Sequence, residues 1–171
     1  MIYLNIGSNL PSKFGDRFIN IEKSIDLLTS KSVKLEKVSS FYETPSYPNP
    51  KFPNFINISI KVESTLSPKK FLNEIKLIEK KLGRLKTQKN EPRVCDIDII
   101  DYKGQIIKDE KLQIPHAKLH LRNFVLYPLK EIDPNWSHPI FNKKIDFFLK
   151  RLSFKSHIEI TRLKKSAIFN Q

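Results

Sequence analysis

Hydrophobic and polar residues alternate along several stretches of the chain, which is the pattern of a β-strand with one buried face. The clearest case places Ile56, Ile58, Ile60 and Val62 on one face and polar residues on the other. Three prolines between residues 46 and 53 exclude strand pairing there, because proline lacks the amide that a sheet needs. Strands are therefore predicted at residues 2–6, 33–44, 55–63, 96–102 and 105–107.

Other stretches repeat their apolar residues at intervals of three and four, as one face of a helix requires. In the clearest of them, Phe71, Ile75 and Ile78 belong to one apolar stripe. Ser67 suits the N-cap of that helix and Gly83 its C-terminal cap. Helices are predicted at residues 14–29, 67–83, 123–132 and 143–152.

The order of these elements, β-α-β-β-α-β, indicates an α+β protein of the ferredoxin-like type. We expect one antiparallel sheet with helices on one face, followed by additional C-terminal helices. Residues 1–171 are predicted to form a single domain, because a chain of 171 residues can bury one core. Residues 153–171 form a basic, weakly patterned tail of this domain.

The amino-acid composition excludes several kinds of structural and binding site. One cysteine, Cys95, excludes a disulfide framework and a cysteine-based zinc site, and it suits a reducing compartment. The chain shows no secretory signal or membrane-spanning run, so we expect a cytoplasmic protein. The net charge of +13 suits nucleotides, nucleic acid or a lysine-rich solvated surface. Four glycines cannot be combined into a glycine-rich phosphate-binding loop.

Asp96 and Asp98 carry the most informative chemistry. Alternate residues of a strand share a face, so these two carboxylates project together, roughly 7 Å apart at Cα. Carboxylates this close repel each other, and a divalent cation relieves the repulsion. Mg²⁺ uses one or two carboxylates and completes its shell with water and substrate phosphates. Arg93 suits a phosphate beside such a metal. The alternative is a strand end with both aspartates in solvent.

Phe55 and Asn57 lie on the strand face opposite to Ile56 and Ile58. Phe55 offers a flat surface for an aromatic heterocycle, and Asn57 offers a donor and an acceptor. Such residues on an open sheet are commonly plain surface residues. Combined with the aspartate pair and the basic loop 84–93, they indicate a site for a flat ring beside a metal-held polyphosphate.

The chain resembles the 6-hydroxymethyl-7,8-dihydropterin pyrophosphokinase family of folate biosynthesis over roughly residues 2–150. Short motifs carry the resemblance, and they occur in the family's order. They are Gly7-Ser8-Asn9, the run from Val38 to Pro45, Phe55-Ile56-Asn57, the run from Glu79 to Arg84, Pro92-Arg93-x-x-Asp96-x-Asp98-Ile99-Ile100, Pro115-His116, and Arg122-Asn123-Phe124 with Pro128-Leu129.

The resemblance implies transfer of the terminal diphosphate of ATP to the hydroxymethyl oxygen of the pterin, which yields AMP. ATP is then the co-substrate and Mg²⁺ the cofactor, as two ions on Asp96 and Asp98, with Arg84 and Arg93 completing the catalytic set. The implied ATP-binding residues are Leu72, Glu79, Arg84, Lys86, Arg93, Ile99, Lys111, His116 and Arg122. The implied pterin-binding residues are Thr44, Pro45, Ser46, Phe55, Asn57, Asp96 and Phe124.

The expected partners are these two small molecules, with no nucleic acid and no membrane. A monomer is expected, and association with other folate-pathway enzymes is left open. Glu91, Asn90, Ala117 and Leu121 depart from the family's pattern in loops near the ligands. We therefore expect the fold and metal site to be retained and nucleotide affinity or loop closure to be altered.

Two alternatives remain at this stage. A basic ferredoxin-like sheet with an exposed aromatic is also the plan of an RNA-recognition domain, although the paired stacking aromatics of that module are missing here. A non-catalytic interaction protein derived from the enzyme is the third hypothesis. Magnesium-independent, salt-sensitive RNA binding would favour the RNA-recognition domain. Loss of Mg²⁺ binding with normal folding would favour the non-catalytic interaction protein.

Overall fold

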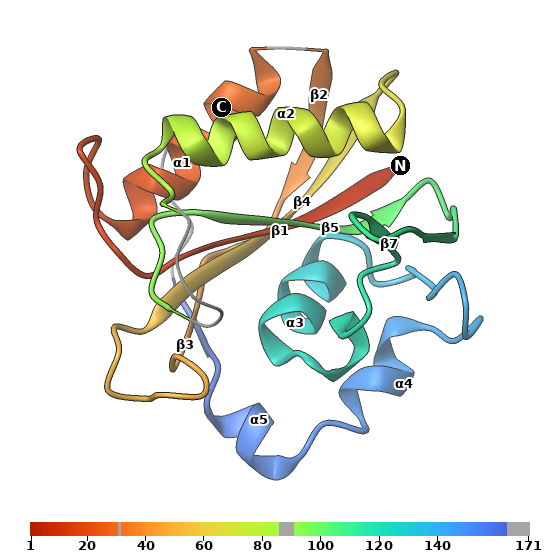
Figure 1. Ribbon diagram of the computed structural model, residues 1–171. Helices are drawn as coiled ribbons and strands as arrows, with labels where there is room; N and C mark the ends of the chain where they lie inside the picture. Colours follow the sequence, from red (N-terminus) through yellow and green to blue (C-terminus); the bar gives the residue numbers. More distant parts are fainter. Residues whose placement is uncertain (31, 86–90, 164–171) are drawn as a thin grey trace.

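The protein is built around a six-stranded sheet (Figure 1), seen in a computed structural model that describes residues 1–30, 32–85 and 91–163. The strand order is β5-β1-β4-β3-β8, and β2 pairs with β4 beside β3. The strands are β1 (Ile2–Ser8), β2 (Val33–Val38), β3 (Tyr42–Thr44), β4 (Phe55–Ser64), β5 (Asp96–Tyr102) and β8 (Thr161–Arg162).

The topology confirms the ferredoxin-like prediction. Strand β1 lies between β4 and β5 and is antiparallel to both, with Gly7 opposite Asn57 on one side and Asp96 on the other. This register places Asp96, at the start of the predicted metal strand, one strand away from Asn57, with only β1 between them. The end of β1 is therefore the point where the two halves of the predicted site meet.

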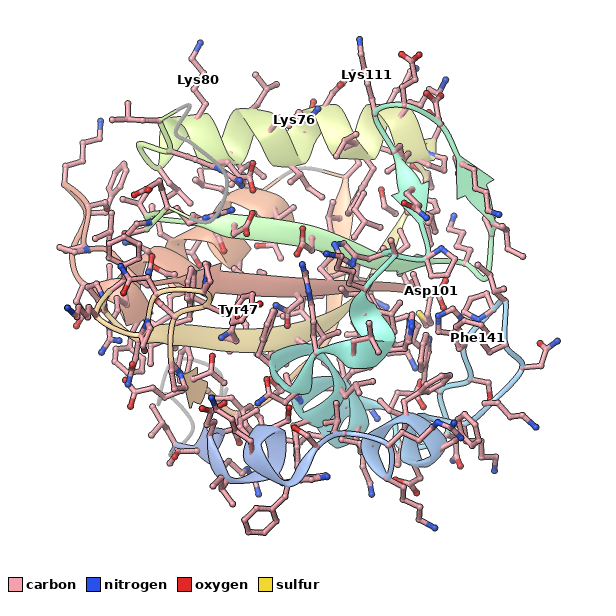
Figure 2. The ribbon with its side chains drawn as sticks, turned by 60° about the horizontal axis from the view of Figure 1, so that its bottom comes forward. Tyr47, Lys76, Lys80, Asp101, Lys111 and Phe141 are labelled. Carbon is pink, nitrogen blue, oxygen red and sulfur yellow. The ribbon has the colours of Figure 1, made fainter. Side chains whose placement is uncertain are left out.

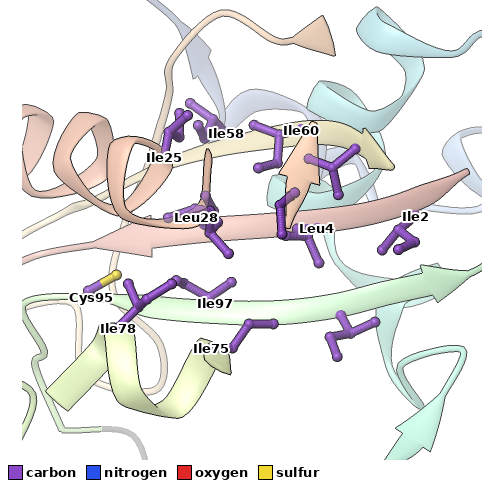
Figure 3. Packing of buried hydrophobic residues seen from close by; sticks show 14 of the residues in the cluster. Ile2, Leu4, Ile25, Leu28, Ile58, Ile60, Ile75, Ile78, Cys95 and Ile97 are labelled. Carbon is purple, nitrogen blue, oxygen red and sulfur yellow. The ribbon is translucent and has the colours of Figure 1, made fainter. Parts of the chain in front are cut away.

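Helices α1 (Arg17–Thr29) and α2 (Pro68–Lys81) cover one face of the sheet. Ser67 caps α2 by accepting from the Lys70 amide, as predicted, while α1 starts at Arg17 because Asp16 accepts from the next amides. The core between these helices and the sheet is mostly aliphatic (Figure 3). It includes Ile2, Leu4, Ile25, Leu28, Ile58, Ile60, Ile75, Ile78, Cys95 and Ile97.

The opposite face of the sheet is also covered, which differs from the expectation of helices on one face. Helices α3 (Asn123–Ile132), α4 (Ile145–Leu149) and α5 (Phe154–Ile158) lie on that side (Figure 1). A second core forms there, because the sheet residues Tyr3 and Ile100 pack against apolar residues of α3 and α4. The predicted helix 143–152 is correct in place but only five residues of it are α-helical.

The predicted strand 33–44 is interrupted at Ser39 and Ser40. Ser39 Oγ accepts the Ser59 amide at 3.0 Å, and the Ser40 amide donates to Glu131 Oε1 at 3.0 Å. These side-chain contacts replace part of the regular ladder, as serine side chains commonly do. Strands β2 and β3 therefore pair with different halves of β4.

Two other segments differ from the sequence prediction. The predicted strand 105–107 corresponds to β6 (Ile107–Lys108), which pairs with β7 (Gln113–Ile114) in a separate hairpin, apart from the main sheet. Within the tail 153–171, α5 is followed by β8, which pairs with β3. The part of the tail up to Leu163 thus contributes to the fold, and residues 164–171 lie outside the described range.

Candidate active site

Asp96 and Asp98 project from the same face of β5, opposite to the buried Ile97 and Ile99. Their side chains are 28% and 30% exposed. The pair therefore faces a solvent-accessible region beside α3 instead of the aliphatic core under α2. This arrangement agrees with the alternation read from the sequence.

Three side chains surround Asp96. Arg84 Nη1 donates to Oδ1 of Asp96 at 2.7 Å, and Arg93 Nη1 donates to Oδ2 at 3.0 Å. Arg84 also donates to Glu79, whose Oε1 accepts the backbone amide of Ile97 at 2.8 Å. Glu79 is 8% exposed, so it is a buried link between α2 and β5 and not a surface glutamate. Burial raises the pKa of Glu79, while Arg84 and the Ile97 amide oppose that shift.

Asp98 has a different set of neighbours. Arg122 Nη1 lies 3.5 Å from Asp98 Oδ2, and His116 Nε2 lies 4.0 Å from the same oxygen. Burial and then the charge of Asp96 raise the pKa of Asp98 above that of an ordinary aspartate. Two close carboxylates that disfavour each other's charge are a suitable binding pair for a divalent cation.

His116 lies between the Lys118 amide and the Arg122 guanidinium. Burial and the nearby Arg122 guanidinium lower its pKa to about 4. The Lys118 amide donates to Nδ1 of His116 at 3.2 Å, and Nε2 lies 3.4 Å from Arg122 Nη1 and 4.0 Å from Asp98 Oδ2. His116 therefore stands beside Arg122 and Asp98 without carrying a charge.

The other half of the site lies on β3 and β4. Asn57 is 3% exposed and donates to Thr44 Oγ1 at 3.3 Å, which connects two of the predicted pterin contacts. Phe55 pairs with Thr44 in the β3–β4 register. Ser46 donates to the Pro53 carbonyl at 2.6 Å, which closes the loop that follows Thr44 and Pro45. The sequence-predicted residues on this side thus belong to one connected group.

Phe124 enters from α3, on the covered face of the sheet. Its ring lies 5.4 Å from the Arg122 guanidinium carbon, within range of a cation–π contact. The Asn5 side-chain amide is buried, and in the orientation that pairs its hydrogen-bonding groups its nitrogen donates to the Phe124 backbone carbonyl at 3.0 Å. Asn5 pairs with Asp98 in the β1–β5 register. Phe124 and Arg122 therefore stand next to the aspartate strand.

Asn9 connects the two halves of the site, and the sequence reasoning missed this role. Its Oδ1 accepts the Arg93 amide at 2.7 Å, and its Nδ2 donates to Ser46 Oγ at 3.1 Å and to the Pro53 carbonyl at 3.2 Å. Asn9 is 1% exposed. Its place in the motif Gly7-Ser8-Asn9 was the available signal, but its partners lie far away in the sequence.

The remaining predicted residues are not among the side chains that contact the two aspartates. Leu72 and Ile99 belong to the aliphatic cluster between α2 and β5, on the other face of β5 from the aspartates. Lys111 lies in the turn between β6 and β7, and its side chain points outward (Figure 2). That turn is tied to the start of α2 by the ion pair Lys69–Asp109, at the opposite end of the helix from Arg84. Lys86 and Asn90 lie outside the described residues.

The donor set fits a hard cation that takes few protein ligands. Among the residues that the structure describes, no group of three or more His, Cys, Asp and Glu side chains is placed to hold a metal alone. Asp96 and Asp98 supply two carboxylates on one face, which is the number that Mg²⁺ commonly takes from a protein when phosphates complete its shell. The residues present are therefore compatible with Mg²⁺ bound together with a polyphosphate.

Comparison with known proteins places the chain at two levels, its fold and its family. The fold is that of a crystal structure of Plasmodium falciparum HPPK-DHPS with pterin and p-hydroxybenzoate, with a TM-score of 0.69 and 17% identity over 94% of this chain and 46% of that chain. The architecture thus defines the class of fold first, as an α+β domain with an antiparallel sheet. The chain belongs to the family described as 7,8-dihydro-6-hydroxymethylpterin-pyrophosphokinase (HPPK), whose model matches residues 3–134.

Curated relatives support the same assignment. A 2-amino-4-hydroxy-6-hydroxymethyldihydropteridine pyrophosphokinase of Aquifex aeolicus is 40% identical over 147 residues, which cover 86% of this chain and 89% of that protein. The folic acid synthesis protein FOL1 of Dictyostelium discoideum is 43% identical over 139 residues, but the chain spans only 20% of its length. The resemblance recognised in the sequence is confirmed. None of the described helices is long and apolar enough to cross a membrane.

Proposed function

We propose that this chain transfers the terminal diphosphate of ATP to 6-hydroxymethyl-7,8-dihydropterin, as a step of folate biosynthesis in the cytoplasm. The hydroxymethyl oxygen attacks the β-phosphorus of ATP, and the bond from that phosphorus to the α–β bridging oxygen breaks. The products are AMP and the pterin diphosphate, and the hydroxyl proton is released. The names of the family and of the relative from Aquifex aeolicus support this reaction.

One observation carries the proposal. Asp96 lies across Gly7 from Asn57, and Asp98 follows two residues later on the same face of β5. The guanidinium groups of Arg84, Arg93 and Arg122 surround these two carboxylates. The carboxylates and guanidinium groups suit a polyphosphate with its metal. The Asn57 side-chain amide suits the hydrogen-bonding edge of a flat heterocycle. Their separation by a single strand, β1, brings the two substrates to the same end of the sheet.

We assign Asp96 and Asp98 as the ligands of two Mg²⁺ ions. When bound, these ions neutralise phosphate charge and align the reacting groups for in-line displacement. Arg84 and Arg93 neutralise Asp96 in the structure. A cation on that carboxylate would free both guanidinium groups to donate to phosphate oxygens, where they stabilise the charge that develops during transfer.

On the nucleotide side, His116 and Arg122 donate to phosphate oxygens, and Leu72, Glu79 and Ile99 border the adenosine pocket. We extend the same ATP-binding role to Lys86 and Lys111. On the other side, Thr44, Pro45 and Ser46 contact the pterin through their backbone, Asn57 bonds its edge, and Phe55 and Phe124 pack against its ring. The hydrogen bond from Asn57 to Thr44 and the one from Ser46 to the Pro53 carbonyl support this grouping.

The test is AMP release from ATP and Mg²⁺, with and without 6-hydroxymethyl-7,8-dihydropterin. We expect AMP only when the pterin is present, and its diphosphate as the second product. Pterin-independent release, or no release by a protein with a cooperative thermal transition, would contradict the proposal.

The variant Asp98→Asn tests the metal assignment. It keeps the shape of the side chain but removes one of the two negative charges, so we expect turnover to fall at least about 100-fold. The thermal midpoint should not decrease, because a half-buried carboxylate close to the carboxylate of Asp96 is replaced by a neutral amide. Turnover within a few-fold of the unsubstituted protein would exclude Asp98 as a metal ligand.

A further inference from the structure

Glu131, near the end of α3, has contacts that reach three segments of the chain. Its Oε1 accepts from the Ser40 amide at 3.0 Å and from Ser40 Oγ at 2.9 Å, and its Oε2 accepts from Tyr42 Oη at 2.9 Å. Arg162 of β8 donates to the same Oε1 at 3.1 Å. The Glu131 side chain is only 17% exposed. One carboxylate thus holds together α3, the start of β3 and the C-terminal strand.

The contacted part of β3 leads directly to the pterin side of the site. Tyr42 pairs with Asn57 in the β3–β4 register, and Thr44, two residues later, accepts the Asn57 side-chain amide. β3 is three residues long, so its position depends on what holds its ends and its free edge. Glu131 fixes the first of those ends through Ser40 and Tyr42.

Helix α3 connects Glu131 to the ring-stacking side of the same pocket. Phe124 lies seven residues before Glu131, which is two helical turns and therefore the same side of the helix. Glu131 ties the later turns of α3 to β3, while the first turn carries Phe124 next to Arg122. The position of Thr44, which accepts from the Asn57 amide, relative to the Phe124 ring thus depends on how α3 is docked against β3.

Strand β8 closes the free edge of β3. The end of the described chain lies beside β3 (Figure 1), with Arg162 opposite Tyr42 and the Leu163 amide donating to the Phe41 carbonyl at 2.8 Å. Arg162 Nε also donates to Ser40 Oγ at 3.1 Å, so its guanidinium contacts both Ser40 and Glu131. This strand lies beyond residue 134, where the match to the family model ends.

We propose that Glu131 and Arg162 are positioning residues for the pterin: they hold β3 against α3 and so set the position of Thr44, which holds the Asn57 amide, relative to Phe124. This inference rests on the proposed function. It assigns a role to residues 161–163 of the C-terminal tail, in which β8 completes the pterin-binding half of the site. The ATP-binding half, which is centred on β5, does not depend on it.

Arg162→Ala is the main test, because the Arg162 side chain is 60% exposed and its removal leaves no internal cavity. We expect the KM for the pterin and its equilibrium dissociation constant to rise about tenfold, which is the size expected for one charge-assisted hydrogen bond. The KM for ATP should stay within about twofold. Arg162→Lys keeps the charge and should restore part of the pterin affinity.

Glu131→Gln should likewise raise the KM for the pterin and leave the KM for ATP nearly unchanged. The rise should be larger than in Arg162→Ala, because this substitution weakens four contacts at once. Lys155→Ala is the matched control, since it removes one tail charge whose exposed ion pair with Glu159 lies on α5. It should leave both KM values unchanged.

Equal changes in both KM values, or an unchanged pterin affinity in Arg162→Ala, would overturn the inference while leaving the proposed function intact. Absence of pterin-dependent AMP release from the unsubstituted protein would contradict the proposed function. In that case, direct pterin binding to Arg162→Ala still decides whether the positioning role holds, and failure of the unsubstituted protein to bind pterin overturns both.

Discussion

Gly7 shows at the scale of one residue how closely β1 approaches the pterin side of the site. A methyl group added at this position would lie 2.8 Å from Asn57 Oδ1 and 3.5 Å from the Phe55 ring. The first distance is shorter than a normal non-bonded contact, so Asn57 would have to move. The absence of a side chain at Gly7 therefore keeps the Asn57 amide in place between β1 and β3.

Gly7→Ala is expected to weaken pterin binding more than ATP binding, because the displaced group is Asn57 and not a ligand of the phosphates. We expect the KM for the pterin to rise about tenfold or more, the cost of losing a well-placed polar contact. Gly104→Ala is the control: no atom lies within 4 Å of the added methyl, but φ is +70°. It should cost about 1 kcal/mol of stability and leave both KM values unchanged. Similar KM changes in the two variants would contradict this role of Gly7.

Residue-level prediction succeeded where a short-range rule applied. The shared face of Asp96 and Asp98 follows from strand alternation, and the capping role of Ser67 follows from its position before Pro68. Asn9 and Glu131 could not be assigned in this way. Their partners are separated from them by 84 and 91 residues respectively, and only the folded chain brings those segments together.

At the scale of the elements, Asp133 fixes the C-terminal end of α3 to the sheet. Its Oδ2 accepts from Tyr3 of β1 at 2.6 Å and from Lys61 of β4 at 3.1 Å. Burial opposes ionisation of Asp133, but the hydrogen bonds from Tyr3 and Lys61 outweigh it and lower the pKa of this carboxyl. The ionised side chain therefore stabilises the folded state.

The pH dependence of this contribution has a definite sign. Because the folded pKa is lower than the unfolded value of about 3.9, the stabilisation is complete above that pH and is lost as the pH falls through the folded pKa. Asp133→Asn should lower the free energy of unfolding by about 1–2 kcal/mol at neutral pH. Urea unfolding near neutral pH and again at about pH 2.5, below the unfolded pKa, measures this. A deficit of equal size at both pH values would show that the variant loses packing and not charge.

Elements were predictable when their own sequence specified them. The alternation in β4 and the apolar stripe of α2 identify these elements without tertiary information. Strand β8 has two residues and no such pattern, and it exists because β3 offers an open edge. The break between β2 and β3 likewise depends on Ser59 and Glu131, which lie elsewhere in the chain. Coverage of both sheet faces required the packing of α3, which periodicity alone does not assign.

At the scale of the whole molecule, the covered sheet separates this protein from an RNA-recognition domain. That module stacks bases on an open sheet face. Here α3 and α4 pack on the corresponding face with Tyr3 and Ile100. The lysines of α2, such as Lys76 and Lys80, point away from the sheet on the other side (Figure 2). The basic surface and the sheet therefore do not combine into one nucleic-acid platform among the described residues.

The net charge of +13 still acts on the substrates, and it acts on them unequally. ATP with bound metal remains anionic, whereas the pterin carries no net charge at neutral pH. Salt shortens the range of the protein's field from about 10 Å at ~0.1 M to about 3 Å at ~1 M. Salt ions can screen the three guanidinium groups of the site, because these side chains are 20–30% exposed. They belong to Arg84, Arg93 and Arg122.

Raising the concentration of sodium chloride at constant Mg²⁺ should therefore increase the KM for ATP several-fold and leave the KM for the pterin almost unchanged. Initial rates of AMP release, with each substrate varied in turn, measure both values. Sucrose at the same osmolality is the control for effects of water activity, and it should change neither. If salt raised both KM values in parallel, it would be acting on the folded structure or on closure of the site. If salt changed neither, the excess of positive charge would be a property of the surface without a part in substrate capture.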